Sequence, residues 1–86
     1  MATVVICCVK DAKLNEYSMP MVFPTIGVAE RSFVTEIRST NQESNLCKYP
    51  DDYALYAIGN VYLETGHIEP FDPPLLIVQG SVVKGS

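Results

Sequence analysis

The sequence predicts a small α+β domain in which one helix packs on one face of an antiparallel or mixed sheet of four or five strands. Two observations support this prediction. Several short runs are rich in β-branched and aromatic residues, as strands are, whereas only residues 26–37 repeat apolar side chains at gaps of three and four, which is typical of a helix with one buried face. The chain has 86 residues, enough for one hydrophobic core. We therefore expect one domain over residues 1–80 and a loose C-terminal tail over residues 81–86.

The first half of the chain supplies two strands and the helix. Residues 3–9 form a β-branched run, which predicts a central strand. Residues 17–23 contain Pro20, which has no backbone donor, so they suit an edge strand whose pairing with the first strand stays open. Thr25 is placed to cap the helix, which should end near Ser39. The expected buried helix face consists of Ile26, Ala29, Phe33 and Ile37.

The second half predicts a loop, a hairpin and a last short strand. The residues between 41 and 52 are polar and irregular in pattern, so we expect a mobile loop there. A strand should follow and break at Gly59-Asn60, and residues 64–66 have the composition of a hairpin turn. The expected strands are 53–63, 67–71 and 75–78, with Asp72-Pro73-Pro74 breaking the ladder between the last two.

The charge balance limits how the protein can bind nucleic acid. Six Lys and Arg stand against ten Asp and Glu, a net charge of −4, so the average field repels phosphate and argues against a generic DNA coat. A local cluster of cations beside tyrosines on a sheet would still suit single strands. The candidate nucleic-acid-binding residues are Arg31, Arg38, Lys48, Tyr53, Tyr56 and Tyr62. The alternative is structural, because tyrosines in strands are usually half buried.

No residues have the spacing of a catalytic or metal-binding motif. Asp51-Asp52 is expected to cap a turn, and the single histidine, His67, has no nucleophile or acid at a motif spacing. Cys7, Cys8 and Cys47 are interpreted as reduced thiols, with the adjacent pair on opposite sides of a strand. We therefore expect no enzyme, no catalytic residue, no cofactor and no metal. No apolar run approaches the ~20 residues of a membrane helix, so we expect no membrane contact.

The order of several short motifs resembles one family of phage proteins. Residues 49–59, with a proline, two aspartates and a tyrosine, and the turn at 64–68 are similar to a pattern in the small nonstructural proteins of gokushoviruses, which are Microviridae bacteriophages. Further positions that look like this family are Pro20, Phe23, Gly27, Ala29, Arg31 and Phe33. Together the positions cover roughly residues 17–70. The chain departs from the pattern at Val61-Tyr62-Leu63 and at His67.

The resemblance implies a nonstructural protein made in the cytoplasm of the infected bacterial host, which acts in replication or packaging of a single-stranded DNA genome. The first hypothesis is a non-enzymatic accessory protein that binds single-stranded DNA, as a homodimer formed through an open sheet edge. The alternative is an acidic protein interaction module that contacts the replication initiator, the scaffold or a host factor without DNA contact. Candidate partners are thus single-stranded DNA and phage replication or procapsid proteins.

Overall fold

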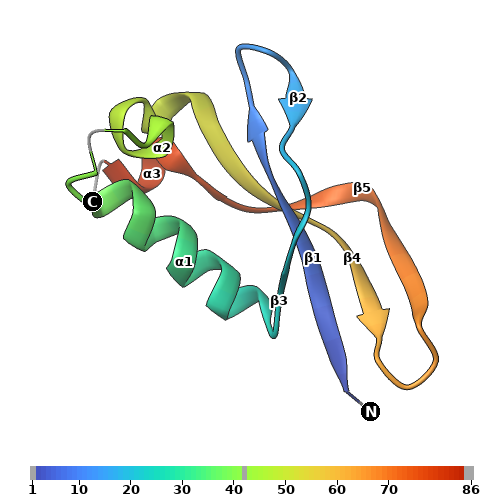
Figure 1. Cartoon of the computed structure of the whole chain (residues 1–86). Helices are drawn as coiled ribbons and strands as arrows, with labels where there is room; N and C mark the ends of the chain where they lie inside the picture. Colours follow the sequence, from blue (N-terminus) through green and yellow to red (C-terminus); the bar gives the residue numbers. More distant parts are fainter. Residues whose placement is uncertain (1, 42, 85–86) are drawn as a thin grey trace.

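The computed structural model describes residues 2–41 and 43–84 and has a curled antiparallel sheet with one long helix across one face (Figure 1). The predicted α+β class, with four or five strands and one packed helix, is confirmed. The elements are β1 (Thr3–Asp11), β2 (Glu16–Tyr17), β3 (Met21–Phe23), α1 (Ile26–Arg38), α2 (Asn45–Lys48), the 3-10 turn η1 (Pro50–Asp52), β4 (Tyr53–Tyr62), β5 (His67–Gln79) and α3 (Gly80–Lys84).

Strand β1 lies inside the sheet, as its composition predicts. It pairs with β4 on one side and with β2 and β3 on the other, and β5 pairs with β4 at the far edge. The edge strand predicted over residues 17–23 is divided into β2 and β3. Between them, the Val9 N–H donates to the Oγ of Ser18 at 2.9 Å, so a side chain replaces a carbonyl of the ladder, and Pro20 offers no donor.

The core lies between α1 and the sheet face that β1 and β4 present to it. Ala29, Phe33 and Ile37 of the helix are buried in one cluster with Val5 of β1 and Leu55 of β4. Three of the four helix positions that the periodicity predicts are therefore confirmed. Burial of this apolar stripe is what holds the helix on the sheet.

The ends of α1 lie where the polar residues predict them. The Oγ1 of Thr25 accepts a hydrogen bond from the Val28 N–H at 3.1 Å, and the Ser39 hydroxyl donates to the Glu36 carbonyl at 2.8 Å. Ile26 is 37% exposed, so its predicted place in the core is wrong. It lies in the first turn of α1, before the first core residue, Ala29.

The polar stretch between residues 41 and 52 is not the irregular loop that its composition suggests. It contains α2, whose N-cap Ser44 accepts a hydrogen bond from the Cys47 N–H at 3.3 Å, and η1, which begins at the buried Pro50. Polar residues and a proline mark loops, but they also supply the caps and first residues of short helices. The composition of this stretch is therefore equally typical of a loop and of short helices.

Strands β4 and β5 form a longer hairpin than predicted. The turn at residues 64–66 is confirmed, with Gly66 at φ 76° and its N–H donating to the Tyr62 carbonyl at 2.7 Å. β4 continues through Gly59-Asn60 without a break. The irregularity in its pairing is a bulge at the preceding residue, Ile58. β5 continues to residue 79, although residues 71–74 leave the ladder.

The predicted loose tail is wrong for residues 81–84, which belong to α3. Val83 is buried, and Gly80 lies so close to η1 that a Cβ there would overlap the carbonyl oxygen of Pro50. A helix of five residues is too short to show a helical period in the sequence. Residues 85 and 86 of the predicted tail lie outside the described residues.

We predict that Gly80→Ala lowers the free energy of unfolding by about 1–3 kcal/mol, because the added methyl group must displace the η1 backbone. Gly27→Ala is the matched control: a Cβ there meets only the Thr25 Oγ1 at 3.8 Å, so the helix should gain up to about 1 kcal/mol. Urea unfolding followed by circular dichroism measures both changes. Equal stability of the two variants would contradict the close packing of α3 on η1.

Candidate nucleic-acid interface

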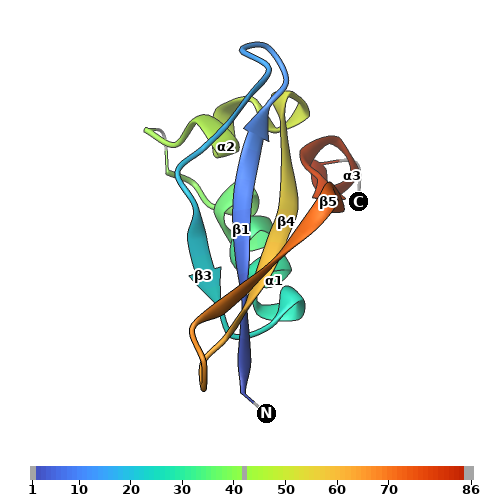
Figure 2. The same ribbon diagram turned by 90° about the vertical axis from the view of Figure 1, so that its right-hand side faces the viewer.

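The two faces of the sheet have different environments. Val5 and Cys7 of β1 are buried toward α1, and Ile6 and Lys10 alternate with them on the other side. Figure 2 shows α1 behind the sheet, where it covers only the first of these faces. We call the second the helix-free face. The ladders assign to it Val4, Ile6, Cys8, Lys10, Tyr17, Val22, Ala54, Tyr56, Gly59, Val61, Ile68, Pro70, Leu76 and Gln79.

At one end of the helix-free face, two tyrosines flank a lysine. Tyr17 of β2 pairs with Lys10 of β1, and Tyr56 of β4 pairs with the next residue on that face, Cys8. The two tyrosine rings meet edge to face, with centroids 5.6 Å apart and planes at 83°. The Nζ of Lys10 lies 5.4 Å from the centroid of the Tyr17 ring. We call Lys10, Tyr17 and Tyr56 the tyrosine site.

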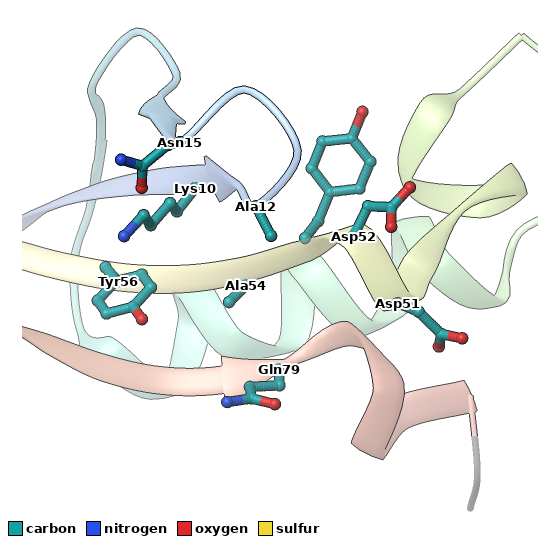
Figure 3. Close-up of a pocket in the computed structure, with 9 residues that line it drawn as sticks. Lys10, Ala12, Asn15, Asp51, Asp52, Ala54, Tyr56 and Gln79 are labelled. Carbon is teal, nitrogen blue, oxygen red and sulfur yellow. The ribbon is translucent and has the colours of Figure 1, made fainter.

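A shallow depression of about 250 Å³ lies beside the tyrosine site. Figure 3 shows Ala54 of β4 between Lys10 of β1 and Gln79 of β5, with Asp51 near η1 at the other end. Pockets that enclose a small ligand usually measure ~300–1,000 Å³ and are deep. This open surface instead suits an extended ligand that lies across the strands.

The helix-free face has a different charge from the protein as a whole. Of the positions that the ladders assign to it, one is a cation, Lys10, and none is a carboxylate. Asp51 and Asp52 border this face, since both line the depression beside Lys10. Asp52 forms an ion pair with Lys13 at 3.6 Å, and Glu69 accepts a hydrogen bond from the Tyr62 hydroxyl at 3.1 Å. The net charge of −4 is therefore not spread evenly over the surface.

The three cations proposed from the sequence lie away from the tyrosine site. Arg31 and Arg38 are exposed on α1, seven residues apart and on the side of the helix opposite to Phe33. Lys48 is exposed at the end of α2. Because α1 covers the other face of the sheet, these side chains do not share a surface with Tyr56.

Of the three tyrosines proposed from the sequence, Tyr53 and Tyr56 line the same depression, whereas Tyr62 pairs with Thr3 at the far end of β1. Tyr53 is half buried against the core cluster on the α1 side. Burial raises the pKa of its hydroxyl, and the nearby carboxylates of Asp11 and Asp52 raise it further. The hydrogen bond to Glu69 raises the pKa of Tyr62, whose ring stacks on His67 with centroids 5.7 Å apart.

The bulge at Ile58 explains this separation. Tyr56 and Tyr62 are six residues apart, so plain alternation along a strand places them on one face. One extra residue in β4 reverses the alternation, and Tyr62 then pairs with Thr3, on the face of Val5. Of the six proposed residues, Tyr56 alone belongs to the helix-free face.

Sequence reasoning missed Lys10 and Tyr17. The signal was present, since Lys10 continues the alternation of Val4 and Ile6, and a tight turn after Asp11 places Tyr17 opposite Lys10. The predicted strand ended at residue 9, and its pairing partner was left open. The register between two strands, which only the fold supplies, brings the two rings together.

The cysteines lie in two environments. Cys7 and Cys8 are both buried, on opposite faces of β1, and burial raises the pKa of each thiol; the Cys8 thiol adds to the rise at Cys7. Cys47 is half buried, and its Sγ donates to the Ser39 carbonyl at 2.8 Å. Within residues 2–41 and 43–84, no three His, Cys, Asp or Glu side chains gather as metal ligands would.

The family of the chain follows from comparison with known protein families. A family model described as Phage ORF5 protein matches residues 4–83, which include every strand bar the first residue of β1. The chain belongs to this family. Comparisons of this Phage ORF5 family member with curated proteins and with solved structures found no match. In the part of the chain that the structure describes, no helix is long and apolar enough to cross a membrane.

For this ORF5 family member, we predict that a disulfide reagent such as 5,5′-dithiobis(2-nitrobenzoate) modifies Cys47 first, and Cys7 and Cys8 only as fast as the protein unfolds. Burial raises the pKa of the Cys7 and Cys8 thiols above the ordinary value of about 8.5. Their contribution to the free energy of unfolding is therefore fully present below that value and is lost as the pH rises through the raised pKa values. Cys47→Ser should remove only the fast phase. Rapid modification of all three thiols in the folded protein would contradict the burial of Cys7 and Cys8.

Proposed function

We propose that this Phage ORF5 family member is a non-enzymatic accessory protein that binds single-stranded DNA during genome replication or packaging. We also propose that the protein comes from a gokushovirus and acts in the cytoplasm of the infected bacterium. The tyrosine site supports DNA binding, because Lys10, Tyr17 and Tyr56 lie on the one sheet face that has no helix over it and no carboxylate at its paired positions.

The gokushovirus source is supported by the motif order between residues 17 and 70, which resembles the small nonstructural proteins of gokushoviruses. The Phage ORF5 match over residues 4–83 supports a phage source in general. Those phages have single-stranded DNA genomes, so an unpaired strand is the nucleic acid to consider first. An open, slightly hollow sheet face suits such a strand better than a duplex, which is usually read by an element inserted into a groove.

The chemistry of the site predicts binding that depends on stacking more than on charge. A base that stacks on an exposed aromatic ring contributes about 1–3 kcal/mol, and Tyr17 is 43% exposed. Lys10 offers one phosphate contact, so the logarithm of the affinity should fall with the logarithm of the salt concentration at a slope of only about −0.7. The acidic remainder of the chain limits nonspecific accumulation on DNA.

We predict that the protein binds labelled oligo-dT in low salt and that Tyr56→Ala weakens this binding about 5- to 150-fold, because a stacking surface is lost. Tyr56→Phe should bind nearly as well as the wild type, since the ring remains. Tyr49→Ala is the control, because Tyr49 is 56% exposed but follows α2, away from the tyrosine site. Fluorescence anisotropy measures the affinities, and equal losses for Tyr49→Ala and Tyr56→Ala would reject the assigned surface.

We predict that Lys10→Gln flattens the salt dependence nearly to zero while some affinity remains, because the rings still stack on bases. Lys48→Gln is the matched control on α2 and should leave the slope unchanged. Titrations at several salt concentrations give both slopes. A steep slope in the wild type that Lys48→Gln reduces and Lys10→Gln does not would place the phosphate contacts on the helical side.

The alternative function, protein interaction without DNA contact, is favoured by a different surface. An apolar groove of about 240 Å³ lies between β3 and the helices and is lined by Val9, Met21, Phe23, Ala29, Ser32, Phe33, Glu36, Leu46 and Leu55. Met19, beside it, is 84% exposed. If the wild type fails to bind oligo-dT in low salt even at high protein concentration, the interaction module becomes the better explanation.

A further inference from the structure

The other end of the helix-free face is aliphatic. Ile68, Val61 and Val4 pair in one row across β5, β4 and β1, and Ile6 pairs with Val22 in the next row. Val22 is 60% exposed and Ile68 is 55% exposed. We call these five residues the aliphatic patch. No helix among the described residues covers it, since α1 lies behind the sheet (Figure 2).

The surface area of the chain is larger than a monomer of its mass requires. The accessible area is 5658 Å², whereas the scaling for monomeric proteins gives about 5,050 Å² at 9.5 kDa. This excess of about 600 Å² belongs to the molecule as a whole, which exposes more surface than a compact monomer of the same mass. The molecule is also elongated, at 40 × 23 × 22 Å.

We propose that a second copy of this chain packs face to face on the aliphatic patch. In a two-fold dimer each patch meets the same patch, so it must be compatible with itself. Two uncharged aliphatic surfaces meet this condition, and the paired positions of the helix-free face around the patch carry no carboxylate, which lets two chains of net charge −4 approach there. Interfaces between identical chains are also more apolar than other interfaces.

The sheet edges are less suited to the dimer, although an open edge was the expectation from the sequence. β5 contains Pro70, Pro73 and Pro74, which cannot donate to a neighbouring strand, and residues 71–74 bulge out of its ladder. The outer edge on the other side is formed by the two short strands β2 and β3. Prolines, bulges and short strands are the devices by which proteins prevent edge pairing.

The proposed dimer is compatible with the tyrosine site, but it does not depend on the function proposed for that site. Tyr17 and Tyr56 lie at the opposite end of the helix-free face from Val61 and Ile68. A two-fold axis that lies in the interface between the two patches, at right angles to β4, brings the patches face to face. The two tyrosine sites then point away from each other. Both sites then remain open to a ligand.

The test is the mass of the protein in solution, measured by size-exclusion chromatography with light scattering over a range of concentrations. The wild type should show twice the 9.5 kDa chain mass, and Val22→Glu and Ile68→Glu should each reduce it to one chain, because a carboxylate would be buried at the interface. Leu14→Glu is the control: Leu14 is 67% exposed in the β1–β2 turn and should leave the dimer intact.

Circular dichroism establishes that each variant is folded, and the methyl NMR signals of Val22 and Ile68 give a second measurement that needs no variant. These signals should shift on dilution of the wild type, while those of Leu14 stay fixed. A wild type that is monomeric at all concentrations would overturn the proposal, as would a dimer that both glutamate variants retain. Oligo-dT binding by the monomeric variants separates this proposal from the function of the tyrosine site.

Discussion

The contact between one helix and one face of the sheet determines what the rest of the molecule can do. Ala29, Phe33 and Ile37 bury the apolar stripe of α1 on β1 and β4, and nearly all of the small core lies at this contact. A helix of 13 residues is about 20 Å long and covers one face only. The second face is therefore left open, and both the tyrosine site and the aliphatic patch lie there.

The features predicted from the sequence are those that local patterns determine. The apolar side chains at gaps of three and four predicted α1. Thr25 and Ser39 marked the ends of this helix, and Gly66 marked the hairpin turn. Short helices had no such pattern: the four residues of α2 and the five of α3 are shorter than two helical turns, so polar and glycine residues there suggested a loop and a tail. Packing on the core, as at Val83, decides these segments.

The composition of the candidate site required information that the sequence does not carry locally. Tyr56 lies in a strand, as the sequence predicts, but its neighbours Lys10 and Tyr17 depend on strand pairing across a turn. Tyr62 was proposed with it as another tyrosine of the same predicted strand. The single bulge residue Ile58 moves Tyr62 to the other face, so one inserted position changes the composition of a surface.

The proposed DNA site and the proposed dimer contact use different ends of the helix-free face, one aromatic and one aliphatic. Rings beside one cation favour a polar, unpaired strand, because bases stack on them and a phosphate can approach Lys10. The aliphatic end has no polar partner to offer and gains most from contact with another apolar surface. Under the proposed function, the site binds DNA at one place without coating it, since the remaining negative charge repels further phosphates.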